Sequence, residues 1–242
     1  MKDDTMNELG GVQLWEGGPF WAECNIGATK PEEYGYYFWW GDTVGYKYEE
    51  RMESVPADGF WASLFDKRKM VMVGEWNAVN GSRKGFEFSE GNCPTYGKSV
   101  SALRSMGYLD KAGNLTAAHD AATAHLGKPW RLPTMGEFKA LCDNCDTEWT
   151  QRNGVWGRLV KGRGAFSTKS IFLPAAGFGF GGGSALSRAG SYGGYWSATP
   201  DSGDSGNAWD LCFDSGNFDW DDLYRCYGQS ARALCPLREF AE

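Results

Sequence analysis

The chain has 242 residues, of which 42% are hydrophobic and 15% aromatic, and it contains 34 glycines. This composition supports a packed core and favours short strands and loops over a helical bundle. The formal net charge of −7 argues against nucleic acid or an anionic membrane as a partner, and no apolar run is long enough to insert across a bilayer.

The N-terminus and the cysteines give limited information. Residues 1–11 carry no hydrophobic signal-peptide segment. The seven cysteines are odd in number and do not form paired metal-binding motifs. Cys142 and Cys145 form a lone CxxC without a second pair or a neighbouring histidine, so we expect buried packing thiols and not a zinc or redox site. This cysteine usage indicates a reducing compartment.

Residues 11–43 are typical of strands joined by tight turns. Their aromatic run at 34–40, YGYYFWW, has two interpretations, a ligand platform or part of the core, and we favour the core. Residues 44–93 are less regular and alternate charged clusters with aromatic patches. Because no low-complexity linker separates them, we interpret 44–93 as an insertion packed over the core of a single domain spanning 1–242.

An Ala-rich helix is predicted over 115–126, with Thr116 as its N-cap and Gly127 at its end. His119 and His125 lie six residues apart, which places them on different faces of that helix. A shared metal is therefore not expected, and we interpret both histidines as structural.

A second helix is predicted to begin near Thr134, because Thr134 followed by Glu137 forms a capping box. From residue 148 onward, strands and glycine-rich turns are expected, with a hairpin turn at Asn153-Gly154. The glycines at 177–183 match neither a GxGxxG nor a P-loop pattern, so a phosphate cradle is not predicted.

The C-terminal region contains an alternating segment at 209–214. Period-two alternation predicts a strand with Trp209, Leu211 and Phe213 in the core. On the opposite face, Asp210, Cys212 and Asp214 are expected to face solvent.

The residues around this strand have an unusual composition. Residues 201–227 contain no Lys, Glu, Gln or Met, although a solvated surface ordinarily uses Lys and Glu. The exposed positions carry Asp, Ser, Gly, Cys, Leu, Tyr, Arg and Asn instead. All of these can be reached from the asparagine codon AAC by changing only its adenines, whereas Lys, Glu, Gln, Met and Trp cannot. We predict a variable region at about 191–230 whose ligand-binding positions are Asp201, Ser202, Asp204, Ser205, Asp210, Cys212, Asp214, Asp219, Asp221, Asp222, Leu223, Tyr224, Cys226 and Tyr227.

Several long segments resemble one family, the Fibrobacter succinogenes major paralogous domain of gut Bacteroidetes and their phages. They are FWAECNIGATKPEEYGYYFWWGDT, DAATAHLGKPWRLPTMGEF, SIFLPAAGF, YWSAT and GQSARAL. The resemblance covers nearly the whole chain except 44–93. Cys142, in place of an aliphatic residue, and residues 233–235, in place of an arginine-proline-valine ending, depart from the family pattern.

The resemblance implies an α+β C-type-lectin-like fold, with two helices, a small twisted antiparallel sheet and long loops. It also implies a function, because some members are variable proteins of diversity-generating retroelements, in which an error-prone reverse transcriptase rewrites adenines. The expected partner is a protein or glycan on a target cell, and the carrier a phage tail or bacterial surface. Tyr224 and Tyr227 are expected to contribute most of the binding energy. Trp220, Arg225 and residues 228–230 are expected to hold the loop that lies between these three.

Three alternatives stay open: an enzyme, a calcium-dependent lectin and an invariant adhesion or structural module. A formylglycine-generating enzyme would use Cys212 and Cys226, and a glycosidase would use carboxylates among 219–222. We expect no enzyme, because a catalytic residue should not lie where variation is generated. No cofactor is expected, with a calcium ion on the acidic surface as the alternative.

Overall fold

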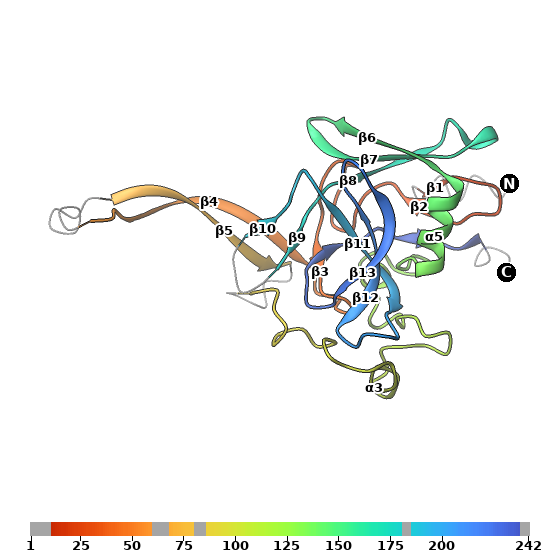
Figure 1. The fold of residues 1–242 in the computed structure, drawn as a ribbon, viewed down its shortest axis with the longest axis horizontal. Coiled ribbons are helices and arrows are strands. Elements are labelled where there is room, and N and C mark those ends of the chain that lie inside the picture. Colours follow the sequence, from red (N-terminus) through yellow and green to blue (C-terminus); the bar gives the residue numbers. More distant parts are fainter. Residues whose placement is uncertain (1–10, 60–67, 80–85, 181–184, 238–242) are drawn as a thin grey trace.

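Strands account for about 40% of the described residues of the computed structural model and helices for 12%. The described residues are 11–59, 68–79, 86–180 and 185–237 (Figure 1). The N-terminal segment without a signal-peptide pattern and the glycines at 181–183 lie outside these ranges, apart from Gly11. The expected α+β C-type-lectin-like fold is wrong, because the chain is sheet-rich with few helices.

Seven strands of the described chain form the central sheet, in the order β13-β12-β11-β14-β3-β4-β5. Their bounds are β3 (Tyr37–Phe38), β4 (Tyr46–Pro56), β5 (Arg68–Ala78), β11 (Gly193–Pro200), β12 (Asn207–Phe213), β13 (Phe218–Tyr224) and β14 (Gln229–Ser230). β14 pairs parallel with β11 and antiparallel with β3, and so joins the C-terminal strands to the N-terminal ones.

Smaller sheets flank the central one. β1 (Gly11–Gln13), β2 (Phe20–Ala22) and β15 (Leu234–Cys235) form one, and β6 (Asp146–Arg152), β7 (Val155–Lys161) and β8 (Ser170–Pro174) another. β9 (Phe178–Gly179) pairs with β10 (Leu186–Ser187). The predicted hairpin turn is confirmed between β6 and β7, where Asn153 and Gly154 have φ of 49° and 83°.

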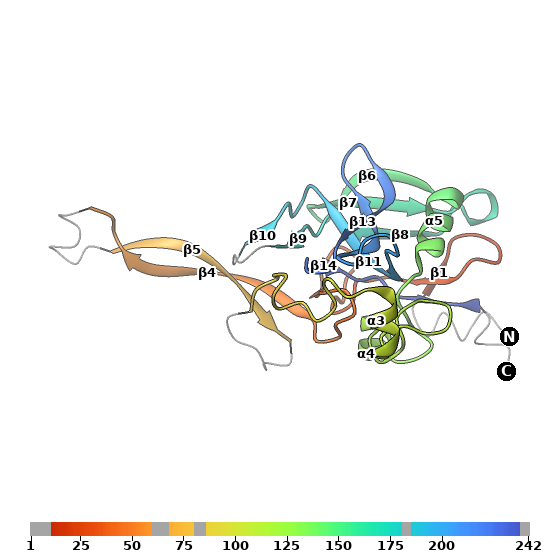
Figure 2. The same ribbon diagram turned by 60° about the horizontal axis from the view of Figure 1, so that its bottom comes forward.

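The segment expected to be a less regular insertion contains a long two-stranded hairpin. β4 and β5 pair continuously from Tyr46 opposite Ala78 to Pro56 opposite Arg68. Figures 1 and 2 show this arm projecting away from the body. Among the described residues of the arm, those at its base pack on the core, where Tyr46 and Trp76 join Phe88. The alternation in RKMVMVGEW was the sequence signal for a strand.

Three short helices occur among the described residues: α3 (Val100–Ser105), α4 (Ala121–Leu126) and α5 (Met135–Asn144). The capping box of α5 is confirmed, since Glu137 N donates to Thr134 Oγ1 (3.3 Å) and Thr134 N donates to Glu137 Oε2 (2.8 Å). The predicted N-cap Thr116 is wrong. Asp120 caps α4 instead, because its carboxylate accepts from both Thr123 N and Leu132 N and so ties the helix start to a distant segment.

Aromatic side chains dominate the core. The core interpretation of the 34–40 run is confirmed for 37–40, which are at most 2% exposed. Trp40 Nε1 donates to Ser197 O (2.9 Å) and Trp196 Nε1 donates to Phe38 O (2.8 Å). These two indole bonds connect β3 and the residues just after it to β11, and so fix the position of the C-terminal strands.

Candidate binding face

The β12–β13 pair carries most of the predicted binding positions. β12 is flanked by β11 and β13, and one of its faces packs towards α5. Leu211 and Phe213 on that face are 0% and 1% exposed, which confirms their predicted core position. Trp209 is only half-buried and contacts Trp220 edge to face, with ring centroids 5.4 Å apart. Its predicted core position is therefore wrong, because its ring lies against Trp220 of the edge strand β13.

Asp210 does not face solvent as predicted, because it is only 1% exposed. The strand alternation does turn it away from Leu211, but a second layer containing Gln229 and Tyr192 covers that face as well. Among the described residues, neither carboxylate oxygen makes a well-formed hydrogen bond. Burial raises the pKa of Asp210 to about 8, the neighbouring Gln229 amide offsets part of this rise, and the carboxylate of Asp221 adds to it.

Cys226 is likewise buried, at 1% exposed, and its predicted exposure is wrong. A turn in which Tyr227 N donates to Tyr224 O directs it inward, and Trp39 Nε1 donates to its carbonyl (3.0 Å). Cys212 is half-buried next to the Tyr192 hydroxyl. Burial raises the pKa of both thiols to about 12, so they stay protonated at neutral pH and are poor nucleophiles.

The loop at 201–206 is exposed at Ser202, Asp204 and Ser205 and half-exposed at Asp201. Each aspartate stabilises a local turn: Asp201 Oδ1 accepts from Gly203 N (2.8 Å), and Asp204 Oδ1 accepts from Gly206 N (2.7 Å). The carboxylates are thereby held in fixed positions.

Arg225 holds this loop, although the sequence predicted a role for it only in the loop between Trp220 and residues 228–230. The side chain is fully buried, and Arg225 Nε donates to Asn207 O (2.7 Å) while Nη1 donates to Lys98 O (2.8 Å). The guanidinium also lies over the Trp40 ring, 4.8 Å from its centroid. Its rigid set of donors connects three segments that are distant in sequence.

The remaining predicted positions lie on β13 and the adjoining turns. Asp219 and Asp221 are exposed, whereas Asp222 and Leu223 are half-buried. Asp214 accepts from the backbone N–H groups of Gly216 (2.8 Å) and Asn217 (2.9 Å), which lower the pKa of its carboxyl. Asp214 therefore stabilises the β12–β13 turn.

A continuous series of aromatic rings crosses this side of the molecule, and we call it the aromatic row. Tyr227 is at its centre, with ring centroids 5.4 Å from Phe178, 4.3 Å from Phe180 and 5.8 Å from Tyr224. The row continues through Phe178 to Tyr192 (5.7 Å) and through Tyr224 to Tyr96 (6.1 Å). Phe180 and Tyr224 are 48% and 44% exposed, so part of the row is open to solvent.

An exposed carboxylate, Asp204, lies at one end of the aromatic row, and the buried carboxylate of Asp210 lies at the other. Gly206 lies close to both the Asp204 carboxylate and the Tyr96 ring, so these two are neighbours. At the other end, Tyr192 lies near Asp210 and Cys212. Half-exposed aromatic rings surrounded by fixed polar groups are typical of recognition surfaces.

Four members of the row, Tyr96, Phe178, Phe180 and Tyr192, were absent from the predicted binding set. The two phenylalanines occur in the glycine-rich FGFGGG, where large apolar residues between glycines were the available signal. Nothing in the sequence indicated that Tyr96 would meet Tyr224.

In the described part of the chain, no group of three or more His, Cys, Asp or Glu side chains could hold a metal ion. Within the same ranges, no helix has the length and apolarity needed to cross a membrane. Comparison with family models, curated proteins and solved structures yields no match to this chain.

Proposed function

We propose that this chain is a non-catalytic binding protein that recognises a protein or glycan on a target cell through the aromatic row and its flanking carboxylates. The observation that carries the proposal is the meeting of Tyr224 and Tyr227 with Phe178 and Phe180 on one partly exposed surface. Tyrosine gives a large contact area at a low cost in side-chain entropy, and aromatic residues dominate binding energy at interfaces.

The carboxylates define the kind of ligand. Asp204, Asp219 and Asp221 are exposed, and the chain as a whole has a formal net charge of −7. Such a surface favours ligands that carry positive charge or hydroxyl donors. Because Arg225 and the aspartate-stabilised turns hold the loop, the face is preorganised and loses little entropy on binding.

We also propose that a retroelement diversified this face, on a protein displayed by a phage tail or a bacterial surface. The codon-restricted composition of 201–227 supports this origin. The scaffold is compatible with it, because exposed positions such as Asp219, Asp221 and Tyr224 can change without loss of core contacts.

The first test is the genomic locus, which should contain a near-identical template repeat beside a reverse transcriptase gene. The template is expected to carry AAC codons at the predicted positions that are not buried: Cys212, Asp214, Asp219, Asp221, Asp222, Leu223, Tyr224 and Tyr227. Differences between template and gene should fall at adenines and spare Leu211 and Phe213. A locus without a template, or with differences in those core codons, would refute the diversification.

The second test is a selection with purified protein. A phage-displayed library randomised at Asp204, Ser205, Asp219, Asp221 and Tyr224 is selected against lysozyme, a basic protein. Its matched control is a library of equal size randomised at five exposed arm positions, Glu49, Arg51, Glu53, Ser54 and Lys69. We expect binders from the first library alone. Equal enrichment from both libraries, or none from the first, would contradict a dedicated binding face.

A further inference from the structure

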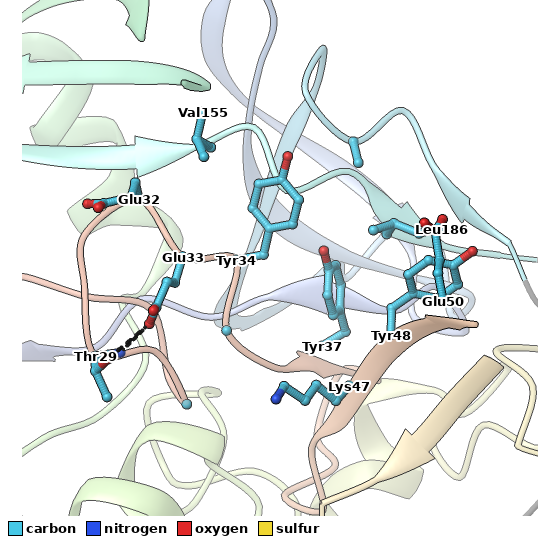
Figure 3. A pocket seen from close by; sticks show the side chains of 13 residues that line it. Thr29, Glu32, Glu33, Tyr34, Tyr37, Lys47, Tyr48, Glu50, Val155 and Leu186 are labelled. Atoms are coloured by element: carbon cyan, nitrogen blue, oxygen red, sulfur yellow. Dashed lines mark hydrogen bonds between the residues drawn. The ribbon is translucent and has the colours of Figure 1, made fainter. Parts of the chain in front are cut away.

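A pocket of about 880 Å³ lies outside the aromatic row. Figure 3 shows Glu32 and Glu33 on one side of it, Tyr48, Glu50 and Leu186 on the other, and Tyr34 and Tyr37 between them. The walls come from the loop before β3, the first half of β4, the start of β7 and β10. The volume is in the range of small-molecule sites, and none of the lining residues belongs to the aromatic row.

The loop wall of the pocket is fixed by its backbone. Gly35 has φ of 72°, and a Cβ there would lie 2.4 Å from Ile26 O, so only glycine fits. Glu33 Oε2 accepts from Thr29 N (2.7 Å) and Lys30 N (3.2 Å), which closes the turn. This wall is therefore formed before any ligand arrives.

The opposite wall is equally constrained. The Tyr48 ring lies over Gly74, where a Cβ would be 1.9 Å from the phenol oxygen, and contacts Trp76 at 5.1 Å between centroids. At the base, the Tyr37 hydroxyl donates to Ala176 O (2.6 Å). A preformed site of this kind keeps the entropy cost of binding low.

The charges around the pocket balance. In its described surroundings, Glu32 pairs with Arg152 (Oε2 to Nε 3.4 Å), Glu33 lies near Lys30, and Glu50 shares the cavity with Lys47. In Figure 3 the Lys47 side chain lies below Tyr34 and Tyr37 and points towards the side of Glu33, away from Glu50. With carboxylates and cations matched, a strongly charged ligand of either sign gains little net attraction.

The polar groups nevertheless offer both donors and acceptors beside apolar surfaces. The Tyr34 and Tyr48 rings, with Val155 and Leu186, supply the apolar surface. Burial raises the pKa of Tyr34 and of Tyr48, so both phenols keep their protons as donors at neutral pH. A neutral ligand with several hydroxyl groups can use all of these groups, because each hydroxyl donates and accepts.

We propose that this pocket binds a neutral saccharide, with a sugar ring against Tyr34 and Tyr48 and its hydroxyls at Glu50 and Lys47. The inference is independent of the proposed function of the aromatic row. It assigns the chain a second recognition site on different elements.

The test is saturation-transfer NMR on the full chain with named probes. The neutral probes are the methyl glycosides of glucose, galactose, mannose and N-acetylglucosamine, together with lactose and maltotriose. Choline and glucuronate serve as the cationic and anionic comparators. We expect at least one neutral saccharide to bind, and neither comparator. Absence of binding by every neutral probe, or binding of a comparator alone, would overturn the proposal.

Variants locate the binding. Tyr34→Ala should weaken saccharide binding by about tenfold or more, because it removes the main apolar contact. Tyr34→Phe keeps the ring, and Lys47→Met changes only an exposed side chain, so both test the pocket without a folding defect. Glu53→Ala on the exposed arm is the matched control and should leave the affinity unchanged, and Tyr224→Ala tests whether the aromatic row takes part. Loss in Tyr224→Ala but not in Tyr34→Ala or Lys47→Met would refute the pocket and move saccharide binding to the row.

Discussion

The Asp210 carboxylate and the Gln229 amide meet on one face of the central sheet, in the space above Gly194. A Cβ on Gly194 would lie 1.9 Å from Gln229 Oε1, so glycine is required for the two side chains to share this space. Among the described residues, neither group has a well-formed hydrogen bond. An unsatisfied buried carboxylate destabilises the folded state, which makes this pair a measurable weakness.

Asp210→Asn should stabilise the protein, and more so as the pH rises. The pKa of Asp210 is raised from 3.8 to about 8 in the folded state, so folding favours the protonated form. The wild-type stability is therefore highest below about pH 4 and falls as the pH approaches 8. We expect a gain on the order of 2–5 kcal/mol at pH 8 but only about 1 kcal/mol at pH 4.5.

Urea unfolding at the two pH values measures this gain. Asp219→Asn is the matched control, because its side chain is exposed on the neighbouring strand directly opposite Cys212. A gain for Asp210→Asn that does not change with pH would show that the carboxylate is not protonated on folding.

The two faces of β12 and β13 should differ sharply in their tolerance of substitution. Leu211 is fully buried, so Leu211→Ala should cost about 2–5 kcal/mol of unfolding free energy. Asp221→Ala changes an exposed side chain and should stay within about 0.5 kcal/mol. Chemical denaturation of both variants tests the division between fixed and variable positions. Similar costs for the two would contradict it.

Local rules predicted the features of this fold that depend on neighbouring residues. The Thr134 capping box and the turn at 153–154 were identified because their hydrogen bonds and φ angles are set within four residues. The buried face of β12 was likewise correct at Leu211 and Phe213, because alternation defines one hydrophobic side.

The features that the sequence did not predict depend on packing between segments far apart in the chain. Alternation placed Asp210 opposite the core face, but it gave no sign that Gln229 and Tyr192 would cover the second face. Asp120, and not Thr116, caps α4, because one of its carboxylate oxygens accepts from Thr123 N and the other accepts from Leu132 N. The aromatic row was missed for the same reason, since its rings come from segments far apart in the chain.

Arg225→Ala should destabilise the chain and loosen the 201–206 loop. The substitution removes the donors to the partly buried carbonyl of Lys98 and to the buried carbonyl of Thr95. It also leaves Asn207 O with Asp201 N as its remaining donor and removes the contact with Trp40. We expect a loss of about 3 kcal/mol. Arg225→Lys should recover little, because an ammonium group cannot donate in several fixed directions at once.

Amide hydrogen exchange gives the local readout for Arg225. The N–H groups of Gly203 and Gly206 should exchange faster in Arg225→Ala than in the wild type, since their turns lose the clamp. The control is Arg51→Ala on the exposed arm, whose ion pairs contribute little. Unchanged exchange at both glycines would mean that the aspartate turns hold the loop by themselves.

The Asn153 position links the β6–β7 turn to the wall of the saccharide pocket. Its φ of 49° is left-handed, and its Nδ2 donates to Glu32 Oε1 (2.6 Å). Asn153→Gly relieves the backbone strain but removes that donor. Asn153→Ala also removes the donor, and alanine tolerates the left-handed φ less well than glycine or asparagine. We therefore expect Asn153→Ala to cost about 1–2 kcal/mol of stability and Asn153→Gly about half as much. Thermal unfolding ranks the two variants, and equal losses would mean that the hydrogen bond to Glu32 alone determines the cost.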